Sequence, residues 1–191
     1  MTPETAGHET GAQDLLAARC HSDDPRYRAI DWRHWRPRER ATLLFVIRDG
    51  QILLIEKKRG LGAGKVNGPG GRLEPGETPL QAAEREIEEE ICVTARDTTA
   101  CGELLFQFVD GHSIHVYVYR APDCAGEPRE TAEAKPFWCA VGAIPYGRMW
   151  ADDGIWVPYM LANRPFHGRF LFDGDRMLGF ELSAPAAGAS P

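Results

Sequence analysis

Short apolar runs of strand length, separated by turn signals, fill most of the chain from about residue 41 onward. Three pairs of these runs are joined by Asp-Gly dipeptides, which favour tight hairpin turns. The dipeptides are Asp49-Gly50, Asp110-Gly111 and Asp173-Gly174. The pattern predicts strands at residues 41–48, 51–57, 104–109, 114–120, 137–141, 166–172 and 177–182.

One segment has helical periodicity and opens with a capping signature. Thr78 is suited to the N-cap and Pro79 to the first helical position, and Gln81 completes a capping box with Thr78. Apolar residues then recur at helical spacing and are expected to face the core: Leu80, Ala83, Ile87 and Ile91. A second helix is predicted over residues 155–163, with Pro158 early in it.

Strands that carry two helices indicate a single domain of the α+β class, which we place at residues 38–184. Residues 1–37 lack sustained periodicity and are expected to form a partly flexible N-terminal extension. Trp32 and Trp35 are the side chains expected to dock this extension onto the domain. Residues 185–191 are small and are expected to form a disordered tail.

The composition then excludes several classes of function. A net charge of −6 over 191 residues argues against binding of a nucleic-acid polymer. The five cysteines show no Cys-x-x-Cys spacing, so reduced thiols are expected. The sequence has neither a membrane-length apolar stretch nor a signal-peptide core. We therefore expect a cytoplasmic protein, a monomer without a membrane partner, that acts on a small molecule.

The first helix carries the most informative charges. Glu86, Glu89 and Glu90 stand at i, i+3 and i+4, so their carboxylates share one face. Like charges at this spacing destabilise a helix unless a cation lies between them, and dense carboxylate oxygens suit Mg²⁺ or Mn²⁺. A solvated acidic face is the alternative, but the glycine-rich entry and Arg85 favour a metal site.

The spacing of this segment resembles the Nudix box, Gly-x5-Glu-x7-Arg-Glu-U-x-Glu-Glu-x-Gly-U, where U is aliphatic. The matching residues are Gly71, Glu77, Arg85, Glu86, Ile87, Glu89, Glu90 and Val93. One position departs, because Cys92 stands where the family has a glycine that ends the helix. We expect Cys92 to reshape this exit or to extend the helix slightly, without loss of a metal ligand.

The resemblance implies the Nudix fold, a mixed β-sheet sandwiched by helices, and hydrolysis of a nucleoside diphosphate linked to another group. It also implies that the metal ligands are Gly70, Glu86, Glu89 and Glu90. One of the glutamates would be the general base, and the spacing does not tell which. Arg85 would orient a glutamate through a charge-assisted bond.

Three further segments, residues 57–68, 149–158 and 166–170, resemble the subgroup of Nudix enzymes that hydrolyse oxidised purine nucleoside triphosphates such as 8-oxo-dGTP. Trp150 and Trp156 have flat faces suited to stacking on a base. The alternative for both is ordinary core packing. The resemblance further implies that Thr42, Lys57, Phe106 and Ile114 line the purine pocket.

Polar side chains of the same segments suit recognition of a base edge. Asn67 has both a donor and an acceptor. Asp152 and Asp153, if they share a pocket, should titrate as a coupled pair in which one carboxyl keeps its proton. A helix N-cap with a solvated neighbour is the alternative for this pair.

Three departures from the subgroup put the substrate in question. Leu61 and Pro69 replace aromatic residues, and Val66 replaces a tryptophan. Two alternatives therefore stay open. One is a Nudix hydrolase of a dinucleoside polyphosphate or a nucleotide sugar, and the other is a module that senses a nucleotide without cleaving it.

Overall fold

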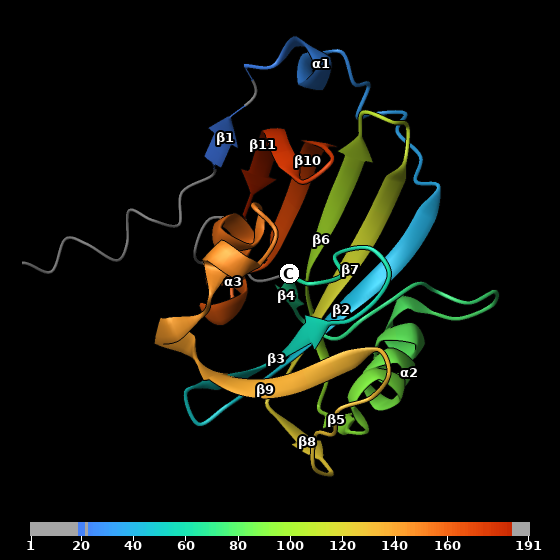
Figure 1. Ribbon diagram of the computed structural model, residues 1–191. Coiled ribbons are helices and arrows are strands. Elements are labelled where there is room, and N and C mark those ends of the chain that lie inside the picture. The colour runs from blue at the N-terminus through green and yellow to red at the C-terminus, as the bar shows by residue number, and fades with distance from the viewer. Residues whose placement is uncertain (1–18, 22, 185–191) are drawn as a thin grey trace, which may run out of the picture.

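The computed structural model describes residues 19–21 and 23–184, which form a mixed β-sheet between two helices (Figure 1). The sheet has the order β1-β11-β10-β6-β7-β2-β3-β4, and β9 pairs with β3. Its strands are β1 (Arg19–His21), β2 (Glu39–Arg48), β3 (Gln51–Lys57), β4 (Val66–Asn67), β6 (Thr99–Phe108), β7 (Ser113–Ala121), β9 (Ala134–Ala140), β10 (Phe166–Asp173) and β11 (Arg176–Ser183). The short strands β5 (Thr94–Arg96) and β8 (Asp123–Ala125) form a separate pair.

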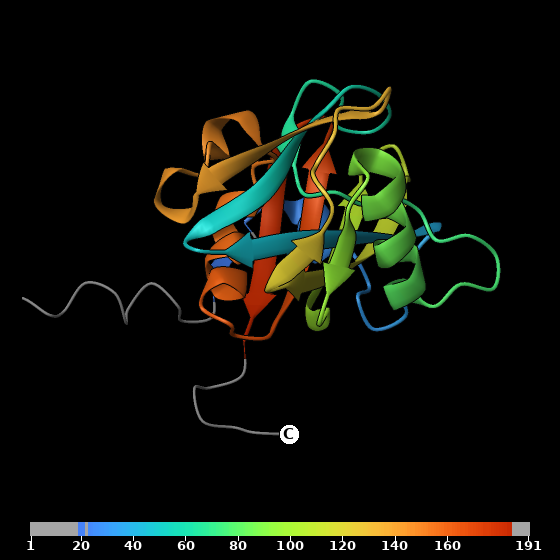
Figure 2. The ribbon, with the colours of Figure 1, turned by 90° about the horizontal axis from the view of Figure 1, so that it is seen from below.

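The helices are α1 (Pro25–Arg28), α2 (Pro79–Ile91) and α3 (Asp153–Leu161), with 3-10 turns at Val141–Ala143 and Tyr146–Arg148. Figure 2 shows α2 and α3 on opposite sides of the sheet. Because side chains alternate along β2, Leu44 packs with α2, whereas Phe45 packs edge-on against Trp156 of α3 with a centroid distance of 5.8 Å. The α+β sandwich expected from the sequence is confirmed.

The turn between β2 and β3 is a true hairpin turn, but the two strands separate immediately. Asp49 and Gly50 have φ values of 51° and 71°, and only Ile47–Ile52 and Arg48–Gln51 pair across the hairpin. Beyond it β2 pairs with β7 in parallel, and β3 pairs with β4 and β9 (Figure 2).

Where β3 separates from β2, the glycine-rich loop (residues 60–71) lies along β2 in its place. The N–H of Leu44 donates to the Pro69 carbonyl at 2.9 Å, and the N–H of Thr42 donates to the Gly71 carbonyl at 2.8 Å. The loop is therefore held against the sheet directly beside α2.

Helix α2 begins as predicted, with both halves of the capping box formed between Thr78 and Gln81. It ends at Ile91, and Cys92 adopts the left-handed conformation with a φ of 63°. The expectation that Cys92 reshapes or extends the helix is therefore wrong, because the cysteine adopts the backbone conformation suited to a glycine. The prediction that Leu80 faces the core is also wrong, because this residue is 38% exposed. Ala82 is buried instead.

Several element boundaries differ from the prediction. Strand β6 starts at Thr99 because it pairs with β7 through a bulge near Ala100 and Gly102, in a stretch without a strong apolar run. Strand β9 starts at Ala134, and α3 starts at Asp153.

The described part of the N-terminal extension packs on the domain. Strand β1 pairs with β11, and Tyr27 of α1 is buried against β10 and β11. Trp32 joins this cluster, and Trp35 Nε1 donates to Gln107 Oε1 at 2.9 Å, so both tryptophans dock as expected. The predicted domain limits stay predictions. Residues 1–18 of the predicted extension and residues 185–191 of the predicted tail lie outside the described residues.

No helix in the described part of the chain is long and apolar enough to cross a membrane.

The left-handed Cys92 yields a stability prediction. This conformation costs an L-residue about 1–2 kcal/mol, whereas glycine is penalised by about 0.5–1 kcal/mol through the entropy of the unfolded chain. Cys92→Gly should therefore raise the free energy of unfolding by about 0.5–1 kcal/mol in urea denaturation. Cys92→Ala is the control, because it removes the thiol and keeps the strain; an equal gain in both variants would contradict the account.

Candidate active site

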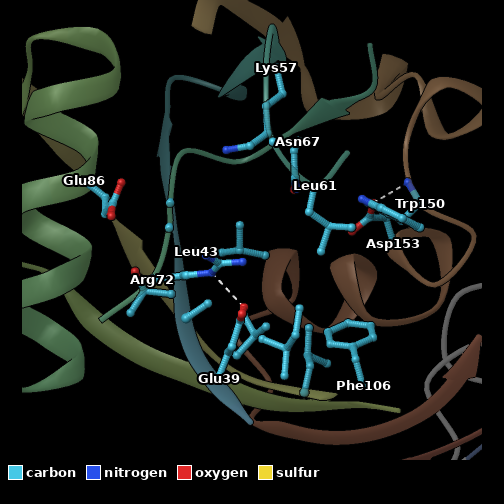
Figure 3. A pocket seen from close by; sticks show the side chains of 18 of the residues that line it. Glu39, Leu43, Lys57, Leu61, Asn67, Arg72, Glu86, Phe106, Trp150 and Asp153 are labelled. Atoms are coloured by element: carbon cyan, nitrogen blue, oxygen red, sulfur yellow. Dashed lines mark hydrogen bonds and ion pairs between the residues drawn. The ribbon is translucent and has the colours of Figure 1, made fainter. Parts of the chain in front are cut away.

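A cavity of about 480 Å³ opens between the sheet, the glycine-rich loop and the start of α3. Figure 3 shows Glu86 at one end of it and Trp150 with Asp153 at the other. All the residues expected to bind substrate line this cavity: Thr42, Lys57, Asn67, Phe106, Ile114, Trp150, Asp152, Asp153 and Trp156. Of the residues expected to hold metal, Gly70, Glu86 and Glu90 line it, and Glu89 is linked to Glu86 through Arg85.

The sequence did not identify every residue that lines the cavity. The others include Glu39, Leu43, Arg59, Arg72, Leu104, Phe108, Val116, Glu133 and Phe172. Two of them carried a usable signal, because Phe108 and Val116 each follow a predicted cavity residue by two positions on the same strand. Leu61 also lines the cavity and is half exposed, while Val66 and Pro69 are buried elsewhere in the loop.

The end of the cavity beside α2, where Glu86 and Glu90 lie, is its acidic end. Glu90 is the most buried carboxylate there, with 1% of its surface exposed. Lys57 Nζ lies 3.0 Å from its Oε1, and the N–H of Gly70 donates to its Oε2 at 2.9 Å. Glu86 points at Gly71, where a Cβ atom would collide with the carboxylate. Glycine at position 71 therefore lets the loop approach α2 closely enough to bring Glu86 to the cavity.

Arg85 joins three glutamates into one network. Its guanidinium forms a bidentate pair with Glu77, at 2.7 and 3.0 Å, and it donates to Glu86 at 3.0 Å and to Glu89 at 2.9 Å. The bond from Arg85 holds the pKa of Glu77 at about 2 and raises the pKa of Arg85 itself. These are charge-assisted bonds of the predicted kind.

The acidic end has the donor chemistry of a divalent-cation site. Burial raises the pKa of Glu86 despite the nearby Arg85, so the ionised carboxylate lacks full compensation there. Among residues 19–21 and 23–184 no group of three acidic, histidine or cysteine side chains has the geometry of a metal site, and Lys57 and Arg85 form ion pairs with Glu90 and Glu89. Hard oxygen atoms from one helix face nevertheless suit a divalent ion that keeps part of its water shell.

The other end of the cavity contains two buried aspartates. Asp152 and Asp153 are each 2% exposed. Asp152 Oδ2 accepts from Trp156 Nε1 at 2.8 Å, and Asp153 Oδ2 accepts from the N–H of Trp150 at 2.9 Å. Asp152 is the N-cap residue of α3, as the alternative expected, but its side chain makes no capping bond and its neighbour Asp153 is buried rather than solvated.

The two tryptophans differ in role. Trp156 is fully buried and packs on Phe45 and Phe166, so the expectation that it presents a stacking face is wrong. It lies in the core and uses its indole N–H to orient Asp152. Trp150 is partly exposed and lines the cavity.

Two buried polar atoms of the cavity residues lack a hydrogen-bond partner within the described part of the chain. They are Asp152 Oδ1 and Thr42 Oγ1. Burial raises the pKa of both aspartates, and the neighbouring Asp152 carboxylate raises that of Asp153 further. Since no cationic side chain of the described residues pairs with these carboxylates as Lys57 does with Glu90, the pair favours a protonated member that can donate to a ligand.

The comparisons with known proteins agree with this geometry. The profile of the NUDIX domain matches residues 37–160. An oxidized purine nucleoside triphosphate hydrolase from Danio rerio is 43% identical over 134 residues, which cover 70% of this chain and 86% of that protein. The protein of the same description from Mus musculus is 36% identical over 143 residues, covering 74% and 92%.

A solved structure, the mutator MutT protein from Bacillus halodurans, matches with a TM-score of 0.68 and 26% identity. It covers 76% of this chain and 97% of that one. The chain therefore belongs to the Nudix family. It is a Nudix hydrolase, a class that uses divalent metal ions.

The raised pKa of Asp153 predicts how stability depends on pH. Between the unfolded and folded pKa values the folded chain binds more protons, so its free energy of unfolding falls as the pH rises. Asp153→Asn keeps an acceptor for the Trp150 N–H and does not titrate. The variant should be more stable than the parent at pH 8, by on the order of 1 kcal/mol or more, and the gain should vanish below about pH 4.

Thermal unfolding at both pH values measures this difference. The exposed Asp97→Asn is the matched control and should show no such gain. The same change in melting temperature at both pH values in Asp153→Asn would contradict the buried-carboxyl account.

Proposed function

We propose that the protein is a Mg²⁺-dependent pyrophosphohydrolase of oxidised or otherwise modified purine (deoxy)nucleoside triphosphates. It would release a monophosphate and pyrophosphate and so remove damaged nucleotides from the precursor pool. The observation that supports this most is one cavity that joins the acidic face of α2 to the buried pair Asp152–Asp153. The relatives from Danio rerio and Mus musculus carry the matching activity in their descriptions.

At the acidic end, Glu86, Glu89 and Glu90 would hold the divalent ion with the Gly70 carbonyl. Bound Mg²⁺, or Mn²⁺ in its place, would supply neutralisation of the phosphate charge and a lowered pKa of bound water. One of the glutamates would take the proton of the attacking water. Arg85 keeps their carboxylates in place, and Lys57 balances Glu90 at the cavity wall.

At the other end, Trp150 would stack on the purine, and the aspartate pair would bind its edge. A protonated carboxyl donates and an ionised one accepts, so the pair can recognise purines whose oxidation has exchanged donor and acceptor positions. The unpartnered Asp152 Oδ1 is available for this bond. Asn67 Oδ1 accepts from the Gly68 N–H at 2.8 Å, so Nδ2 is its free donor.

The alternatives explain fewer features. A sensing module would have no need of a complete acid set, and every acid of the box is present here. The relatives from Danio rerio and Mus musculus are described as hydrolases of purine nucleoside triphosphates, which favours these over a dinucleoside polyphosphate or a nucleotide sugar. We also propose a monomer in the cytoplasm, which accords with the free thiols of the described cysteines Cys92, Cys101, Cys124 and Cys139.

A substrate panel tests the proposal. With Mg²⁺, pyrophosphate release should show a higher kcat/KM for at least one of 8-oxo-dGTP, 2-hydroxy-dATP and O6-methyl-dGTP than for the unmodified nucleotides. Asp152→Asn should reduce this preference and leave the metal dependence unchanged. Equal rates for modified and unmodified purines would rule out the proposed substrate class.

Glu89→Gln tests the metal assignment with little risk to folding, because the Glu89 side chain is 60% exposed. Loss of a ligand should remove several kcal/mol of transition-state stabilisation and lower kcat by at least about 100-fold. Glu88→Gln, an exposed neighbour on the same helix, is the matched control and should keep the parent rate. A Glu89→Gln variant with full activity would exclude Glu89 from the metal site.

A further inference from the structure

Lys65 contacts Trp150 from outside the cavity. Its Nζ lies 4.9 Å from the centroid of the Trp150 ring, a distance suited to a cation–π contact. Trp150 lines the cavity, whereas Lys65 is not among the residues that do. The ammonium therefore contacts the ring without lining the cavity.

Asp175 fixes the ammonium in this place. Its Oδ2 lies 2.9 Å from Lys65 Nζ, and it belongs to the turn between β10 and β11. This turn also leads from Phe172, whose ring meets Trp150 edge-on at 90° and 5.7 Å. The ion pair therefore links the glycine-rich loop to the hairpin of β10 and β11, and Phe172 of this hairpin packs against the indole.

The loop also limits the position of Trp150 sterically. A Cβ atom on Gly62 would lie 3.0 Å from Trp150 Nε1, so the loop backbone lies directly against the indole. The N–H of Lys65 donates to the Gly62 carbonyl at 3.0 Å, which links these two contacts within one turn.

We propose that Lys65, held by Asp175, is a positioning residue that fixes Trp150 as the stacking surface for the purine. The inference rests on the proposed function, because it needs the base to lie on Trp150. Lys65 acts through the indole and does not touch the substrate.

Direct binding of phosphate is the other role open to a lysine near such a cavity. Two observations favour positioning. Lys65 belongs to the same end as Trp150, and its charge is already neutralised by Asp175, whereas Lys57 contacts Glu90 at the acidic end. Removing Asp175 should therefore weaken the binding of the base, while a phosphate-binding lysine would bind an anion more tightly without it.

The test compares Lys65→Met, Lys65→Arg and Asp175→Asn with the parent enzyme on its best modified purine triphosphate. Methionine keeps a long apolar side chain and removes the cation–π contact, so KM should rise about fivefold, with kcat within about twofold of the parent. Lys65→Arg keeps a cation beside the indole, so its KM should equal that of the parent enzyme. Asp175→Asn should raise KM by a smaller factor, and the double variant Lys65→Met/Asp175→Asn should resemble Lys65→Met.

Product inhibition separates the two roles of Lys65. The inhibition constant of the modified purine monophosphate should rise with KM in Lys65→Met, and that of inorganic pyrophosphate should not change. A rise for pyrophosphate, or a KM equal to that of the parent, would overturn the proposal. Trp150→Ala checks its premise: if this variant keeps the parent KM, the proposed base site is wrong, whatever Lys65 does.

Discussion

The candidate site depends on the close approach of a glycine pair to two elements at once. Gly70 passes so near β2 that a Cβ would overlap the Thr42 carbonyl, and a Cβ on Gly71 would overlap the Glu86 carboxylate. Any side chain at these positions would push the loop away from the sheet or from α2. The Gly70 N–H would then lose the buried Glu90 carboxylate, which also pairs with Lys57. The acidic end of the cavity therefore exists because the chain lacks side chains at this crossing.

The two ends of the cavity surround their carboxylates differently. At the acidic end, Lys57 and Arg85 supply positive charge, which holds the pKa of Glu77 at about 2 and partly offsets the burial that raises the pKa of Glu86. At the base end, burial without a cation raises the pKa values of Asp152 and Asp153. Ionised carboxylates suit a divalent ion, and a carboxyl that keeps its proton suits the edge of a base. The difference lies in the neighbours, since all these groups are carboxylic acids.

Local signals in the sequence predicted what depends on neighbouring residues, such as the capping box of α2 and the spacing of its glutamates. Non-local packing was not predictable in this way. The burial of Trp156 depends on Phe45 of β2, more than a hundred positions earlier in the chain, and Lys65 meets Asp175 only because the fold brings the turn between β10 and β11 beside it. Cys92 shows the reverse case, because its residue type predicted an altered helix end and the surrounding fold imposed the left-handed conformation.

A crystal structure of the protein with Mg²⁺ and a non-hydrolysable triphosphate analogue of 8-oxo-dGTP tests the central claim most directly. The account predicts one ligand that spans the cavity, with its base on Trp150 within hydrogen-bond distance of Asp152 and Asp153. It also predicts the metal ion on the carboxylates of Glu86, Glu89 and Glu90. A base bound outside this cavity, or a metal ion held by other residues, would contradict it.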